Sequence, residues 1–269
     1  MLPEVLVKEI MTFLLGTQND YFQVPLVCKQ MKELMKVYKP LCRLEGDFSD
    51  DQIKTIVESM KVEGRKGWKP SITIEGELDR SGKITADGLM EILYDTVVQW
   101  DSIVFRRIRL GNGPLVSINT GTCLQNLRVL ELTDCDGYSS IGFLNFARNN
   151  VSRSLQVLRI QPFHRGHRPD RLTDKIFMGF QRLTALRELE LRGCCDITDA
   201  GLRSYYTFQP DTWLSHPAWD IPEGLARLGQ DVKVTLVDCV FITPGCVQEL
   251  REQYPEIGLQ LSAPVQVIR

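Results

Sequence analysis

One pattern of residues recurs along this chain and restricts its fold more than any other feature. Its copies are Leu130–Phe143, Leu189–Leu202 and Val234–Val247. Each copy opens with two apolar residues separated by one position and has a cysteine three residues after the second. An Ile-Thr pair (Tyr-Ser in the first copy) follows, with another apolar residue four positions after its Thr or Ser. Because self-similarity at fixed offsets is the signature of repeat proteins, we expect stacked units that share one core.

The residue types within one unit predict a short strand followed by a helix. The alternating apolar residues are typical of a strand with one buried face. The Thr or Ser stands where a helix N-cap belongs, and Pro244 suits a first helical position. Helices are expected at Asp50–Met60, Ala86–Gln99, Asp174–Leu183 and Pro244–Gln253. Weaker strand signals occur at Cys42/Leu44, Ile72/Ile74, Ile108/Leu110, Leu158/Ile160 and Leu259/Leu261.

The pattern resembles the cysteine-containing leucine-rich repeats, whose consensus carries an Ile-Thr-Asp-x-Gly-Leu segment like Ile197–Leu202. The similarity is weakest near Gly111–Cys123, where no Thr or Ser hexad is found. Most strand spacings fall between the 22 residues from Leu110 to Leu132 and the 36 from Ile74 to Leu110. The resemblance implies an α/β fold for residues 41–269: a leucine-rich-repeat solenoid with parallel strands on its concave face and helices on its convex face.

Residues 1–40 do not repeat and form a separate predicted unit. Their apolar residues recur at helical spacing on both sides of a polar turn at Gly16–Asp20. Leu-Pro-x-x-Leu at the start and Val-Cys-Lys near the end resemble an F-box, with Met31 where that family has Trp. The resemblance implies docking onto a Skp-type adaptor through Leu2, Pro3, Leu6, Ile10, Leu26, Val27 and Cys28. The alternative is that these helices only cap the first repeat of the solenoid.

Composition narrows the class of protein. The net charge of −2 gives no general attraction to nucleic acid or to an anionic membrane. Pro3 and Glu4 stand where a signal peptide would need apolar residues, and no run approaches the ~18 apolar residues of a membrane span. We therefore expect a cytoplasmic or nuclear protein with reduced cysteines, several of them in the core.

The residues between the core leucines are the first candidates for binding a protein substrate. In a leucine-rich-repeat solenoid they face the concave surface, and they are Arg43, Thr73, Arg109, Glu131, Arg159, Glu190 and Thr235. The middle members alternate in charge, which favours a partner of mixed charge. The alternative is that they only pair with one another across the strands.

Two insertions interrupt the repeat and supply further candidates. Gln161–Arg171 carries Arg165, Arg168 and Arg171, whose guanidinium groups suit a phosphorylated or acidic segment. Arg203–Asp231 carries Trp213 and Trp219 in an aromatic, proline-rich stretch that could anchor a partner or could pack against the side of the solenoid.

These patterns predict an adaptor and not an enzyme. The expected function is that of a substrate-recognition subunit of an SCF-type ubiquitin ligase, with a Skp-type adaptor, a cullin and a protein substrate as partners. No nucleophile–base motif, phosphate loop, metal site or cofactor site is expected; His164-x-x-His167 has too few ligands nearby for a metal. The first alternative is a non-catalytic repeat scaffold. The second is a hydrolase or redox enzyme with its site in the long insertion.

Overall fold

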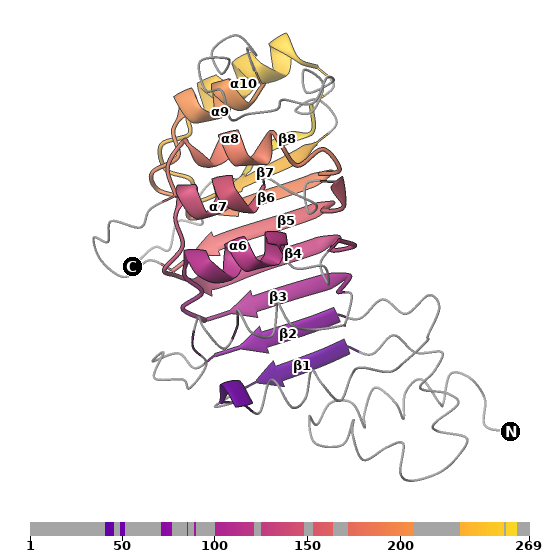
Figure 1. Cartoon of the computed structure of the whole chain (residues 1–269). Helices are drawn as coiled ribbons and strands as arrows, with labels where there is room; N and C mark the ends of the chain where they lie inside the picture. Colours follow the sequence, from indigo (N-terminus) through magenta and orange to yellow (C-terminus); the bar gives the residue numbers. More distant parts are fainter. Residues whose placement is uncertain are drawn as a thin grey trace, which may run out of the picture.

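The computed structural model describes residues 41–45, 49–51, 71–76, 85, 89, 100–120, 125–147, 153–163, 172–206, 232–255 and 257–262 (Figure 1). The predicted division at residue 40 and the seven predicted adaptor contacts lie outside these residues. So do Arg165, Arg168, Arg171, Trp213 and Trp219. The predictions for these positions therefore stay predictions.

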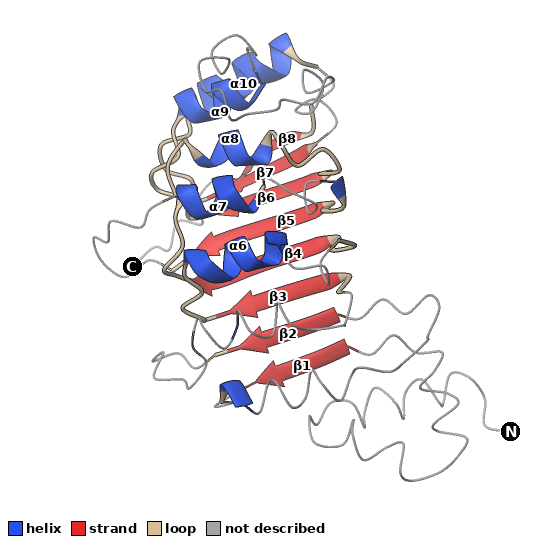
Figure 2. Cartoon of the chain, viewed as in Figure 1, coloured by secondary structure: helices blue, strands red, loops and turns tan. Residues whose placement is uncertain are grey.

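The described residues contain eight strands that form one parallel sheet in the order of the sequence. The strands are β1 (Leu41–Glu45), β2 (Ser71–Glu75), β3 (Ser102–Arg106), β4 (Val129–Cys135), β5 (Val157–Pro162), β6 (Glu188–Arg192), β7 (Lys233–Val237) and β8 (Leu259–Ser262). The named helices are α6 (Asn112–Thr120), α7 (Ser140–Phe146), α8 (Ile176–Phe180), α9 (Asp199–Tyr206) and α10 (Pro244–Gln253). These helices lie along the same face of the sheet, one above the other (Figures 1 and 2).

This architecture confirms an α/β fold with an all-parallel sheet, and it is compatible with a solenoid. Each strand pairs with the next strand of the chain, so the sheet grows by one strand per repeat of the sequence pattern. The prediction for α10 is correct at both ends, whereas α8 is shorter than the predicted helix Asp174–Leu183. Helix α6 occupies the region where the sequence pattern is weakest.

The third strand lies elsewhere than predicted. Ile103 and Phe105 pair in register with Leu130 and Leu132, so β3 precedes the expected strand at Ile108/Leu110. Two pairs of alternating apolar residues, Ile103/Phe105 and Ile108/Leu110, lie within eight residues there. The position of the turn distinguishes the pair that forms the strand from the pair that follows it. Arg107 has a φ of 54°, as Asp134 has 53° and Asp238 54° two residues after the second apolar residue of their strands. The strand therefore ends at Arg106, and Ile108 is buried at the position that Cys135 holds in the next unit.

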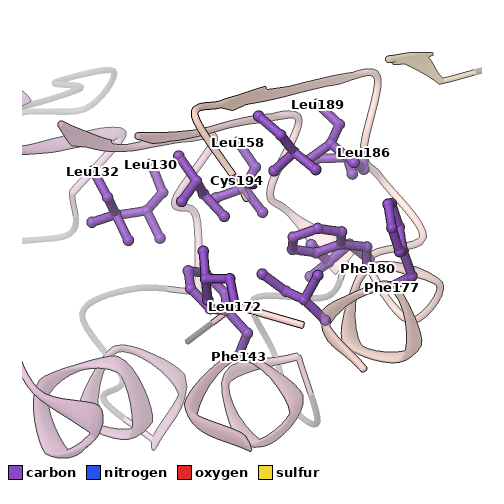
Figure 3. Close-up of a cluster of buried hydrophobic side chains, with 14 of the residues drawn as sticks. Leu130, Leu132, Phe143, Leu158, Leu172, Phe177, Phe180, Leu186, Leu189 and Cys194 are labelled. Carbon is purple, nitrogen blue, oxygen red and sulfur yellow. The ribbon is translucent and has the colours of Figure 1, made fainter. Parts of the chain in front are cut away.

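The core lies between the sheet and the helices. Strand residues such as Leu130, Leu158 and Leu189 are 0% exposed, and they face the helix side chains Phe143 and Phe177 (Figure 3). The aromatic rings continue from one helix to the next through edge-to-face contacts, such as 6.0 Å between Phe143 and Phe180. Burial of each such side chain contributes roughly 1.5–3 kcal/mol, so this shared core is the main stabilising element.

The repeated cysteines belong to this core, as predicted. Cys135, Cys194 and Cys239 are free thiols with at most 4% exposure. The Cys135 thiol donates to the carbonyl oxygen of Phe105 at 3.3 Å, and Cys239 donates to that of Leu191 at 3.5 Å. A small weak donor at this position thus connects one strand to the end of the next strand (Cys135) or to the turn just after it (Cys239).

A second repeated contact connects the helix starts. Asp174 accepts from the backbone N–H and the hydroxyl of Thr198, both at 2.7 Å, and Asp199 binds Thr243 in the same way at the same distances. Asp50 and Thr85 form the earlier copy, at 2.9 and 2.7 Å. Asp174 and Asp199 therefore each hold the Thr of the next unit, and Thr243 also caps the start of its own helix, α10.

Candidate functional site

The face of the sheet opposite the helices presents three rows of side chains, because alternate strand residues point to opposite faces. The middle row runs across consecutive strands through Thr73, Val104, Glu131, Arg159, Glu190, Thr235 and Gln260. Their neighbours along each strand face the core; in β4, for example, Leu130 and Leu132 are both 0% exposed. We call this surface the open face, defined by the middle row and by the first and last residues of the same strands.

Five of the seven residues predicted on this surface have described side chains in the middle row: Thr73, Glu131, Arg159, Glu190 and Thr235. The backbone of Arg43 pairs in register with Thr73, which places it in the same row. The prediction for Arg109 is wrong, since Val104 holds the row position on β3. Arg109 lies in the turn beyond β3, exposed and paired through its backbone with Asp136. The error follows directly from the misplaced third strand.

Charged side chains on the open face form a ladder of ion pairs across four strands. Glu131 lies 3.3 Å from Arg106 and 3.6 Å from Arg159. Glu190 lies 3.5 Å from Arg159 and also pairs with Arg192. The cross-strand pairing that the sequence left open as an alternative is therefore present, and it connects β3 to β6.

Arg159 is the centre of this ladder. Its guanidinium group has three carboxylates around it, with Glu188 at 3.4 Å in addition to Glu131 and Glu190. All three distances exceed the 2.7–2.9 Å typical of a strong charge-assisted hydrogen bond. The Arg159 side chain is 39% exposed, and partly exposed pairs of this kind contribute about 0–1 kcal/mol. The ladder therefore stabilises the fold little and remains accessible to a partner.

The ladder borders a hollow of about 340 Å³ on the open face. Strands β4, β5 and β6 all contribute to its walls, which are mainly polar. The lining residues are Glu131, Leu132, Thr133, Arg159, Ile160, Gln161, Glu190 and Arg192. The formal charges of these side chains cancel, so the hollow suits a polar segment of mixed charge more than a polyanion.

Sequence reasoning missed the flanking residues of the site. Arg106, Glu188 and Arg192 were not among the candidates, although each bonds to a middle-row residue. The signal that would find them is the period of two: residues two positions before and after a middle-row residue share its face. Applied to β6, that rule gives Glu188 and Arg192 directly.

A second hollow, of about 600 Å³, lies at the C-terminal end of the sheet. It is lined mainly by apolar side chains, among them Val240, Ile242, Val247 and Leu261. Val240 and the adjacent Phe241 are 63% and 58% exposed. No candidate residue from the sequence lies in this hollow.

The described part of the chain holds no group of three or more His, Cys, Asp and Glu side chains arranged to bind a metal ion. None of its helices is long and apolar enough to cross a membrane.

A hydrogen bond between the Cys194 and Cys239 thiols lowers the pKa of Cys239 and, together with burial, raises that of Cys194.

In comparisons with known proteins, the chain matches no protein-family model, and no curated protein sequence matches it significantly.

Proposed function

We propose that this chain is a substrate-recognition subunit of an SCF-type ubiquitin ligase, acting in the cytoplasm or the nucleus. In this proposal the sheet and helices are a leucine-rich-repeat solenoid whose open face binds a substrate protein. Residues 1–40 bind a Skp-type adaptor and thereby join the substrate to a cullin ligase. The protein has no active site of its own and acts by bringing the substrate close to a ubiquitin-charged enzyme.

Two repeated contacts support the solenoid interpretation. The Cys-to-carbonyl bonds and the Thr-Asp bridges recur at equivalent positions of units that are far apart in the sequence. Such nearest-neighbour contacts are how a repeat protein holds its units together. The consensus segment Ile197–Leu202 contains the Thr of one bridge, Thr198, which binds Asp174, and the Asp of the next bridge, Asp199, which binds Thr243.

The single observation that carries the recognition role is the accessible ion-pair ladder on the open face. A broad polar surface made of regular strands, with a hollow at its centre, offers charged and hydrogen-bonding groups in fixed positions. Polar groups arranged in this way give specificity more than raw affinity, which suits a receptor that selects one partner.

The experiment that tests the ligase role is direct binding of the full chain to a purified Skp-type adaptor, measured by calorimetry. The natural chain should bind at micromolar concentration or better, which corresponds to about 8 kcal/mol or more. A Leu6→Ala/Ile10→Ala variant should lose this binding because it removes two of the proposed apolar contacts. A Gln18→Ala/Asn19→Ala variant, changed in the predicted polar turn, should bind like the natural chain.

The alternative function is a repeat scaffold without a ligase role. This alternative would be supported if the natural chain did not bind the adaptor although circular dichroism and cooperative unfolding showed that it was folded. Loss of folding in the Leu6→Ala/Ile10→Ala variant alone would favour the same alternative, since residues 1–40 would then serve as a cap.

A further inference from the structure

The open face is not uniform, and one part of it combines apolar and acidic side chains. Three valines occupy neighbouring positions on the open face. Val104 on β3 lies in the middle row, and Val129 on β4 and Val157 on β5 lie in the first row. All three are half-buried while pointing away from the helices. Exposed positions of a sheet normally carry polar residues, so three adjacent valines form an apolar surface that a partner could cover.

Carboxylates continue this surface on the side of β6. Glu188 follows Val129 and Val157 in the first row of the sheet, and Glu131 and Glu190 lie beside them in the middle row. We call the three valines and these three glutamates the valine–glutamate patch.

The charge of the patch is negative in its own two rows. On β4, β5 and β6 the first and middle rows contain three carboxylates and one guanidinium group, that of Arg159. Arg106 and Arg192 lie in the last row, at the carboxyl ends of their strands, and from there pair with Glu131 and Glu190. At the rim, the Arg128 guanidinium group lies 3.8 Å from a carboxylate oxygen of Asp101 and donates a hydrogen bond of 2.9 Å to the side-chain oxygen of Gln156. Lys233, opposite Glu188 on β7, marks the positive boundary of the patch.

We propose that the valine–glutamate patch binds an extended segment of a partner protein in which an aliphatic residue stands close to a lysine or arginine. The aliphatic side chain covers the valines, and the cation lies over the carboxylates that share Arg159. Neighbouring strands are about 4.8 Å apart, and an extended chain advances about 3.3 Å per residue. The two anchoring residues of the partner are therefore one to three positions apart. This inference rests on the proposed function and names the class of segment that the receptor recognises.

The test uses a random peptide library displayed on phage and panned against the full chain. The enriched sequences should share an aliphatic residue and a lysine or arginine within three positions. A fluorescent synthetic peptide of the enriched sequence should bind with an affinity that falls as salt is raised from about 0.05 to 0.5 M, because exposed charge pairs are screened.

Two double variants locate the binding site. Val129→Ser/Val157→Ser removes the apolar part, and Glu188→Gln/Glu190→Gln removes two carboxylates without changing side-chain size. Each should weaken peptide binding at least about tenfold, equal to roughly 1.4 kcal/mol. Glu252→Gln, the same change at an exposed position of helix α10 on the other side of the sheet, is the matched control and should leave the affinity unchanged. Thermal unfolding of each variant establishes that the fold is intact.

Enrichment of acidic or phosphate-mimicking peptides, or equal affinity in the natural chain and both double variants, would overturn the inference. So would a selection that yields no binding peptide. Adaptor binding is measured on the same preparations, so that failure of this inference can be distinguished from failure of the ligase role. If the chain binds the adaptor but the peptide experiments fail, only the inference about the recognised segment is overturned.

Discussion

The two faces of the sheet differ in what holds them together. On the helix side, aliphatic and aromatic side chains with close to 0% exposure meet in one core, and Cys and Thr-Asp contacts repeat with nearly constant distances. On the open face, ion pairs at 3.3–3.6 Å, whose side chains are 20–39% exposed, connect residues that differ from strand to strand. The helix side must fit its neighbouring units and is therefore repetitive. The open face is free of that constraint, so its residues can vary, as the proposed recognition role requires.

The largest expected effect of changing a glycine comes from the close fit on the helix side. A Cβ added at Gly201 would lie 2.3 Å from the Oδ1 atom of Asp174, the atom that binds the next Thr. We expect Gly201→Ala to lower the free energy of unfolding by about 1–3 kcal/mol, because the carboxylate must move and its bonds to Thr198 weaken. Chemical denaturation measures this.

Gly245 supplies the matched control. It lies in the next unit at the position equivalent to Ala200, one residue before the equivalent of Gly201. Its added Cβ would meet only the Thr243 hydroxyl at 3.9 Å, an ordinary contact. Gly245→Ala should stabilise helix α10 by about 0.5–1 kcal/mol. Equal losses in the two alanine variants would contradict the account of Gly201.

Two threonines on opposite faces give the next prediction. The Thr243 hydroxyl accepts from the Cys246 N–H at 3.1 Å and donates to Asp199 at 2.7 Å. Thr243→Ala should cost about 1 kcal/mol or slightly more, as loss of an N-cap usually does. Thr235→Ala, on the open face, should stay within about 0.5 kcal/mol of the natural chain. Denaturation curves that rank the two variants in the reverse order would refute the assignment of separate roles to the faces.

A pH dependence is also expected on the helix side. Burial raises the pKa of the Cys246 thiol to about 11, with a further contribution from Asp199. The unfolded thiol ionises near 8.5, so its contribution to stability is complete below that pH and is lost as the pH rises toward about 11. Cys246→Ala should therefore lose less stability between pH 8 and 11 than the natural chain. Tyr205 and Cys194, whose pKa values are also raised, are present in both proteins, so the difference in slope reports Cys246. Parallel slopes would show that the thiol does not contribute.

The structural features that repeat along the chain could be predicted from the sequence, whereas those that depart from the repeated pattern were missed. The core positions, the cysteines, the parallel α/β arrangement and five open-face residues followed from one motif. The third strand was misplaced because Ile103/Phe105 and Ile108/Leu110 have the same alternation, and only the turn at Arg107 distinguishes them. Helix α6 was missed because Asn112 replaces Asp in the bridge: Asn112 binds the Ser139 backbone N–H at 2.8 Å. The valines of the open face escaped notice because strand propensity alone explains a valine in a strand.

The most direct test of separate roles for the two faces compares neighbouring residues of one strand. Leu132→Ala, Leu158→Ala and Leu191→Ala change the helix side, and Glu131→Gln, Arg159→Gln and Glu190→Gln change the open face beside them. The measurement is the free energy of unfolding of all six variants under one set of conditions. Each leucine variant should lose about 2–5 kcal/mol, whereas each open-face variant should lose no more than about 1 kcal/mol. Open-face losses as large as those of the neighbouring leucines would show that the ion-pair ladder is structural, and would contradict the assignment of this face to recognition.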